Sequence, residues 1–183
     1  MMAAGAIFPA AGQQHLVTPP AGACTSETRA TPSVTSGPFY KSGSPERVSL
    51  LEPNMTGTKL IVTGYVLSRG DCKRVARAWL DFWQASDSGV YDNTGYRLRG
   101  HQFADAAGLY SLETIVPGLY PGRTRHIHVK VRAPNGPTLT TQIFFPGEAR
   151  NQNDGIFNRA LLADVRDDTG GKVAAFDFIV DAR

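Results

Sequence analysis

The sequence predicts an all-β fold: a single-domain β-sandwich of mainly antiparallel strands with long loops and about one short helix. Short runs in which apolar and polar residues alternate, as in half-buried strands, recur from residue 59 onward. Turn-forming words rich in Gly, Pro, Asn and Asp separate these runs. A chain of 183 residues with 42% hydrophobic content can form one core but is short for two.

The first 35 residues show neither a strand period nor a helix period. They are rich in Ala, Gly, Pro and Thr, so they offer little apolar surface to bury. We therefore expect an extended or disordered arm over residues 1–35 and the sandwich domain over residues 36–183. Residues 1–12 are apolar, but they lack basic residues and contain Pro9, so they resemble a signal peptide poorly.

Six alternating runs predict the strands. The run over residues 75–84 carries apolar side chains on both faces, which indicates a strand covered on both sides. The six runs are Lys59–Ser68 and residues 75–84, 110–116, 126–132, 139–145 and 173–181.

One helix is predicted over residues 155–166. Asp154 stands directly before it, where a side chain can cap the first turn. The apolar stripe that predicts this helix consists of Ile156, Phe157, Ala160, Leu161 and Val165.

The charge pattern gives little reason to expect a nucleic-acid or membrane partner. The net charge is +3, and the 19 Lys and Arg residues are scattered rather than grouped. No apolar stretch approaches the roughly 20 residues that span a bilayer, and no internal repeat is visible. The sequence leaves the oligomeric state open, and a homodimer is possible.

Cys24 and Cys72 are the only cysteines, and their spacing is not that of a metal site. One hypothesis is a disulfide that ties the arm to the body. Such a bond favours an extracytoplasmic or secreted protein, whereas two free thiols are expected in a cytoplasmic enzyme.

The chemistry of the chain is concentrated around a His-x-His pair. His126 and His128 alternate with aliphatic residues in a predicted strand, so both imidazoles project from one face. Tyr120 precedes them in a turn bracketed by Pro and Gly, and such a cluster can hold a metal. The alternative is a solvated basic face, since Lys130 and Arg132 share that register.

Four separated words carry a resemblance to a known family. AWLDFWQASDSGVY ends at Tyr91, RGHQFADAAGLYSLETIVPGLY ends at Tyr120, and RTRHIH and LTTQ follow. In order and spelling, these words resemble the intradiol ring-cleavage dioxygenases over about residues 35–146. The resemblance implies a mononuclear non-haem Fe(III) cofactor held by Tyr91, Tyr120, His126 and His128.

The resemblance also implies a reaction and the residues that assist it. A catechol-type small molecule and O2 would give a cis,cis-muconate-type diacid, with the ring opened between the two hydroxyl-bearing carbons. Tyr120 would leave the metal and take a catechol proton. Arg123 matches the active-site arginine, which stabilises negative charge on the ring, and Gln142 matches the glutamine of the pocket.

Three positions depart from the family's usual spelling: Ser36 replaces an acidic residue, Arg77 a glycine and Phe145 a tyrosine. Catechol, hydroxyquinol and protocatechuate all remain open as substrates. We expect specificity near Tyr40, residues 50–57 and Leu109.

The two tyrosines favour ferric iron, because phenolate is a hard ligand suited to a hard, trivalent cation. Two alternatives remain. A β-sandwich of this size can be a non-catalytic binding module. The chain can also be an inactive homologue that retains the metal site, or one that binds a divalent metal.

Overall fold

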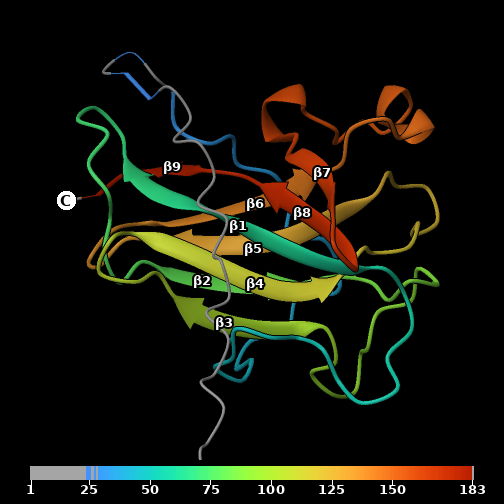
Figure 1. Ribbon diagram of the computed structural model, residues 1–183. Coiled ribbons are helices and arrows are strands. Elements are labelled where there is room, and N and C mark those ends of the chain that lie inside the picture. The colour runs from blue at the N-terminus through green and yellow to red at the C-terminus, as the bar shows by residue number, and fades with distance from the viewer. Residues whose placement is uncertain (1–23, 26, 28, 183) are drawn as a thin grey trace, which may run out of the picture.

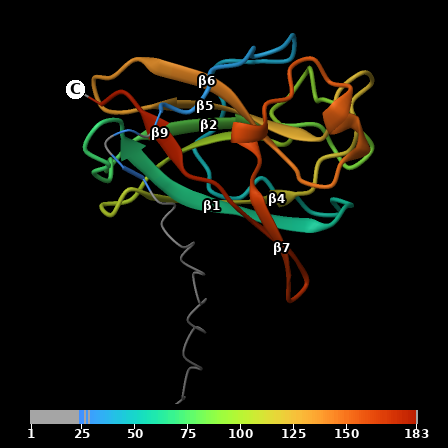
Figure 2. The ribbon, with the colours of Figure 1, turned by 90° about the horizontal axis from the view of Figure 1, so that it is seen from above.

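The computed structural model describes residues 24–25, 27 and 29–182, and it is a sandwich of two β-sheets (Figure 1). One sheet has the order β4-β1-β8-β7, with β9 also paired to β1, and the other has the order β3-β2-β5-β6. Figure 2 shows β2, β5 and β6 in one layer and β1, β4 and β7 in the other. Most pairs are antiparallel; β1 pairs in parallel with β8 and β9. The predicted all-β fold is confirmed.

The described residues form nine strands and two short 3₁₀ helices. The strands are β1 (Lys59–Ser68), β2 (Trp79–Trp83), β3 (Arg99–Phe103), β4 (Leu109–Ile115), β5 (His126–Arg132), β6 (Thr138–Phe144), β7 (Asp164–Asp168), β8 (Gly171–Ala175) and β9 (Phe178–Val180). The 3₁₀ helices are η1 (Ala149–Gln152) and η2 (Arg159–Leu161).

The predicted strands correspond closely to the apolar elements among these. β1 and β5 have the predicted bounds, whereas the predicted strand over 173–181 is divided into β8 and β9. The alternation did not reveal β3 or β7, because RGHQF and DVRDD are mostly polar. Both become strands through pairing with β2 and β8 respectively.

The helix predicted over residues 155–166 is wrong. η2 covers three of these residues, and Asp164 begins β7. Asp154 does accept a hydrogen bond from the Ile156 N–H, but its other oxygen is bonded to residues far away in the sequence. Of the predicted stripe only Leu161 is wholly inside the core; Ile156, Phe157 and Val165 are partly buried and Ala160 is exposed.

The two faces of β5 have different partners, and this difference positions the candidate site. Ile127, Val129 and Val131 are fully buried in the core between the sheets. His126 and His128 therefore lie on the outer face of the same strand. They are also buried, so other chain segments must cover that face.

The arm predicted over residues 1–35 is described only in part, because residues 1–23, 26 and 28 lie outside the described residues. Its last residues follow the sandwich: the Thr31 N–H donates to Ile179 O and the Val34 N–H to Thr140 O. A disulfide joins Cys24 to Cys72, whose Cα atoms are 5.8 Å apart. No helix in the described part of the chain is long and apolar enough to cross a membrane.

Candidate active site

The two histidines of β5 converge on one point. Their Nε2 atoms lie 3.2 Å apart, and both side chains are buried. Two nitrogens bound to one metal ion at about 2.0–2.1 Å and at right angles lie about 3 Å apart. The spacing therefore suits two ligands of a single ion.

His126 presents a free lone pair to this point. Its Nδ1 donates to Thr124 O at 2.6 Å, so the proton of the neutral ring is on Nδ1 and Nε2 is an acceptor. Burial lowers the pKa of His126 to about 4. The ring is therefore neutral near pH 7, as metal ligation requires.

His128 is oriented by an aromatic ring instead of a hydrogen bond. Its imidazole stacks on Trp83 with 4.8 Å between centroids and 5° between planes. Burial lowers its pKa well below the usual value. Its Nδ1 is buried and has no hydrogen-bond partner in the described part of the chain.

Tyr91 adds a third polar group to the two histidines. Its hydroxyl lies 3.4 Å from His126 Nε2 and donates toward it. Burial raises the pKa of the Tyr91 phenol well above its usual range, while the charge of Arg123 lowers it. A buried phenol of this kind ionises only beside a strong positive charge, which a bound cation supplies.

Tyr120 is half-buried and lies beside Tyr91, with their rings nearly perpendicular and 5.9 Å between centroids. The turns that carry the two tyrosines are joined, since the Gly118 N–H donates to Ser86 O at 2.7 Å. A Cβ on Gly118 would lie 2.2 Å from Asp87 O. Glycine is thus required for the approach of the two turns.

Arg123 and Gln142 form the polar wall of the cluster. Arg123 Nη2 donates to Gln142 Oε1 at 2.7 Å, and Gln142 Nε2 donates to Thr35 O. On its other edge, Arg123 Nε donates to Asp154 Oδ2 at 2.8 Å. The guanidinium is therefore held from two sides.

The segment that begins at Thr35 covers the histidine face. Gly37 lies against the ring of His128, and Phe39 stacks on Tyr91 with 4.5 Å between centroids. Tyr40 packs on Trp83. Arg99, almost fully buried, donates to Phe39 O. Water is thus restricted on this side of the two histidines.

The structure brings the predicted site residues together, although they come from four separated stretches. The donors, two neutral imidazole nitrogens and two phenol oxygens, fit a hard trivalent cation. The described residues contain no cluster of three His, Cys, Asp or Glu side chains suited to a metal, so the histidine pair depends on the tyrosines to complete a site.

Several residues that shape the site were not identified from the sequence: Phe39, Trp83, Arg99, Thr124 and Asp154. Asp154 was assigned to a helix cap, and Trp83 only to a strand covered on both sides. Some of their partners are 30 to 60 positions away in the chain, so no local pattern reveals them. Leu109, expected near the pocket, pairs with Tyr65 in the other sheet. Thr56, in contrast, lines a pocket beside Tyr91.

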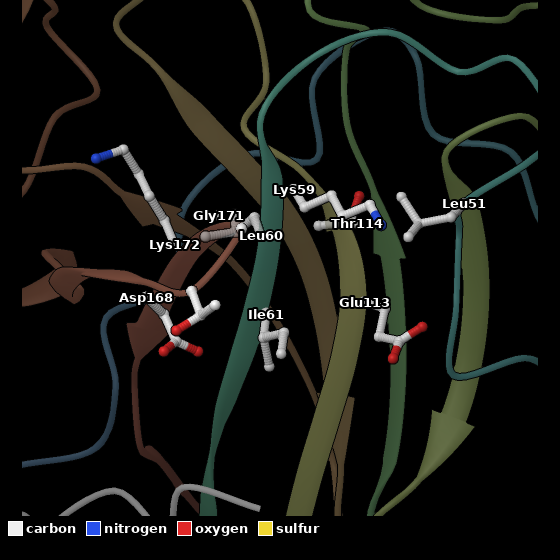
Figure 3. A pocket seen from close by; sticks show the side chains of 11 residues that line it. Leu51, Lys59, Leu60, Ile61, Glu113, Thr114, Asp168, Gly171 and Lys172 are labelled. Carbon is white, nitrogen blue, oxygen red and sulfur yellow. The ribbon is translucent and has the colours of Figure 1, made fainter. Parts of the chain in front are cut away.

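A second pocket lies on the other sheet. Figure 3 shows it among side chains of β1, β4 and the β7–β8 turn. Lys59 and Lys172 balance Glu113 and Asp168 there, and the lining has no aromatic or histidine side chain. This pocket therefore has neither the ligands of the histidine cluster nor a ring-stacking platform.

Comparisons with known proteins identify the relatives of the chain. The sequence model of a family described as "Dioxygenase" matches residues 35–181. A hydroxyquinol 1,2-dioxygenase from Rhizobium sp. (strain MTP-10005) is 30% identical over 165 residues, covering 74% of this chain and 55% of that protein. A catechol 1,2-dioxygenase from Pseudomonas sp. (strain EST1001) is 26% identical over 183 residues, covering 84% and 60%. The chain thus spans between half and two thirds of the length of these relatives.

Solved structures show a similar relationship. The dioxygenase domain of a dioxygenase carbohydrate-binding protein fusion from the cellulolytic bacterium Streptomyces sp. SirexAA-E is 52% identical, with a TM-score of 0.82. The match covers 85% of this chain and 100% of that chain. An intradiol ring-cleavage dioxygenase from Tetranychus urticae, 22% identical and with a TM-score of 0.78 over 84% of this chain and 95% of that chain, shares the fold. The match over residues 35–181, together with the tyrosine and histidine words, shows that the chain belongs to the intradiol ring-cleavage dioxygenase family.

Proposed function

We propose that the chain is a non-haem Fe(III) intradiol dioxygenase that cleaves catechol-type rings with O2 into cis,cis-muconate-type diacids. The observation that carries this proposal is that His128 Nε2 and the Tyr91 hydroxyl lie 3.2 and 3.4 Å from His126 Nε2. Two neutral imidazoles and a phenol that are buried together in this way fit a cation, which would satisfy all three lone pairs at once.

Tyr91, Tyr120, His126 and His128 would hold the ion. When bound, ferric iron supplies Lewis-acid chemistry that favours the ionised forms of phenols and of a chelating catechol. The two tyrosines differ in burial, since Tyr91 is enclosed and Tyr120 is half-buried. This difference supports Tyr120 as the ligand that yields its place and accepts a proton from the substrate.

Arg123 and Gln142 would act on the substrate ring. The permanently charged, planar guanidinium can stabilise negative charge that develops on a ring carbon. Its charge opposes the rise that burial causes in the pKa of Tyr91 and adds to the fall that burial causes in the pKa values of His126 and His128. The Gln142 amide can orient a bound oxygen atom, because its own position is fixed by Thr35 and Arg123.

The relatives, which are named as hydroxyquinol, catechol and protocatechuate dioxygenases, support the proposed substrate class. The chain spans only part of their length, so the ring substituents are an open part of the proposal. Thr56 and Val90 line the pocket beside Tyr91, which supports these positions as contacts for substituents.

We also propose that the protein works outside the cytoplasm. The Cys24–Cys72 disulfide supports this location, because such bonds persist in oxidising compartments. A homodimer and the division at residue 35 stay predictions. The alternative of a non-catalytic binding module gains no support from the pocket of Figure 3, which lacks an aromatic platform.

The proposal is tested on protein expressed with ample iron. We expect one iron per chain and a broad visible band, because phenolates bound to Fe(III) give charge-transfer absorption. Catechol added without oxygen should shift the band to longer wavelength, since catecholate is the easier electron donor. When O2 is admitted, one molecule of O2 should be consumed for each catechol. Mass spectrometry should find both atoms of that O2 in the product.

The outcomes separate the candidate functions. Colourless, iron-free protein would contradict the metal assignment. A spectral shift without oxygen uptake would instead identify an inactive homologue that retains its ligands. A yellow hydroxymuconic semialdehyde would mean cleavage beside the diol and would contradict an intradiol reaction.

A further inference from the structure

We propose, on the basis of the function proposed above, that Asp154 is a positioning residue: it aims the Arg123 guanidinium at the reacting ring and couples it to the turn that orients His126. The four ligands, Arg123 and Gln142 lie in the sequence motifs that carry the family resemblance, whereas Asp154 belongs to none of these motifs. Its role follows from contacts in the structure.

Asp154 is a buried carboxylate with a full set of donors. Its side chain is 2% exposed. Oδ2 accepts from Arg123 Nε at 2.8 Å and from the Thr124 N–H at 2.8 Å, and Oδ1 accepts from the Ile156 N–H at 2.9 Å. Burial raises its pKa, but these hydrogen bonds and the charge of Arg123 together lower it by more. The net result is a pKa below the usual value. The carboxylate is therefore ionised at neutral pH.

The contact with Arg123 fixes the direction of the guanidinium. An arginine side chain has several rotatable bonds and loses rotamer entropy when it is ordered. Asp154 binds the Nε edge while Gln142 binds Nη2. With both positions fixed, the guanidinium needs little further ordering when substrate binds.

The contact with Thr124 links the same carboxylate to a metal ligand. The Thr124 N–H donates to Asp154, and Thr124 O accepts from His126 Nδ1. Asn151 also holds Thr124, because its Oδ1 accepts from the Thr124 hydroxyl at 2.6 Å. The histidine therefore keeps a second support when Asp154 is changed, whereas Arg123 Nε has Asp154 as its acceptor.

This difference makes Asp154→Asn an informative change. Asparagine has nearly the same size, and its one oxygen can still serve Ile156 or the Arg123 and Thr124 donors, but not both. The negative charge opposite the guanidinium is lost. We expect iron content and the visible band to be retained, while kcat for catechol cleavage falls about 10- to 100-fold through misplacement of Arg123.

Glu148→Gln is the matched control. Glu148 also binds the Nε of an arginine, Arg125, at 2.6 Å and lies in the same region of the chain. In the described part of the chain its carboxylate is bonded to Arg125 rather than to Arg123 or the four ligands, so its variant should retain wild-type kcat. The comparison distinguishes an effect specific to the Asp154 carboxylate from the effect of removing any carboxylate in this region.

A double-mutant cycle tests whether Asp154 acts through Arg123. In the Arg123→Ala background, Asp154→Asn should lower kcat less than about twofold further, because the group it positions is absent. Fully additive losses would overturn the proposal. So would an Asp154→Asn variant with wild-type kcat, or one that loses iron, since iron loss would make Asp154 a support of the metal turn only.

A measurement on metal-free protein distinguishes this proposal from the proposed function. In ¹⁵N-labelled protein, the Arg123 Nε–H resonance is identified by its loss in Arg123→Ala. We expect slow solvent exchange in the wild type and in Glu148→Gln, and faster exchange in Asp154→Asn, whose neutral amide oxygen accepts more weakly than a carboxylate. Rapid exchange in the wild type would overturn the positioning role even if the enzyme is active; slow exchange in an inactive protein would overturn only the proposed function.

Discussion

His126 and His128 are two residues apart on β5, and their Nε2 atoms lie 3.2 Å from each other on the outer face of the sheet. At this distance the two ring nitrogens face each other in a buried space. A cation bound between them would accept both lone pairs. The relationship therefore underlies the predictions about the metal.

Changing His128 to Ala should abolish iron binding and bleach the visible band. Trp83, which stacks on His128, offers no lone pair that could replace the lost ligand. Iron per chain, measured together with the visible spectrum, checks this expectation. His101→Ala is the control, because this half-buried histidine lies on β3 and is not among the proposed ligands. Retention of iron by the His128 variant would contradict its assignment.

Arg123→Ala should preserve iron and colour, since arginine donates no lone pair to a metal. Turnover should fall roughly 100- to 1,000-fold, as expected when a charge-stabilising donor is removed. Arg123→Lys should recover only part of the loss, because lysine lacks the planar fork that contacts Asp154 and Gln142 together. Steady-state kinetics with an iron assay measures both effects. Joint loss of iron and activity would instead show that Arg123 supports the structure.

Gly118→Ala should separate the turns that carry Tyr91 and Tyr120. The new Cβ would lie 2.2 Å from Asp87 O, so the backbone must move. We expect a loss of about 1–3 kcal/mol in the free energy of unfolding, typical of overpacking, together with weaker iron binding. Gly155→Ala is the control, because a Cβ on that residue would extend into open space. Equal free energies of unfolding for the two variants in denaturant titration would show that Gly118 is not needed to hold the two turns together.

Removing both Cys24 and Cys72 by substitution with Ser should destabilise the fold without affecting iron. The bond closes a loop with a sequence separation of 48. A disulfide across a loop of this size contributes about 2–4 kcal/mol to the free energy of unfolding. Both residues lie outside the cluster around His126 and His128. Denaturant titration of wild type and double variant, with iron content as the second reading, tests this. Iron loss in the variant would show that the bond also organises the site.

The Asp154 carboxylate should make stability depend on pH in acid. Its pKa is lowered in the folded state, so its contribution is present above the unfolded pKa of about 3.9 and is lost as pH falls through the folded pKa. Near neutral pH, the free energy of unfolding of the wild type should exceed that of Asp154→Asn by about 1–3 kcal/mol. Denaturant titrations of metal-free protein at about pH 7, 5 and 3 should show this difference unchanged at first and then smaller. A difference that grows in acid would have the wrong sign.

The fold class and the ligand candidates could be predicted from the sequence alone. Alternation of period two located β1 and β5 with their bounds, because a strand with one face in the core must place apolar residues at every second position. The same period placed His126 and His128 on one face. The distinctive words around Tyr91, Tyr120, Arg123 and Gln142 then indicated the family and a set of site residues.

The surroundings of those residues depended on tertiary contacts. β3 and β7 are polar segments that become strands through their neighbours, and no local period marks such pairing. The helix predicted after Asp154 failed because its apolar residues do not form one buried face: Leu161 is buried, whereas Ala160 is exposed. The Asp154 carboxylate instead accepts from Arg123 and Thr124, about 30 residues earlier in the chain. Burial and long-range hydrogen bonds depend on how distant segments meet. For that reason the sequence identified the candidate ligands, and only the fold showed what holds Arg123 and His126 in place.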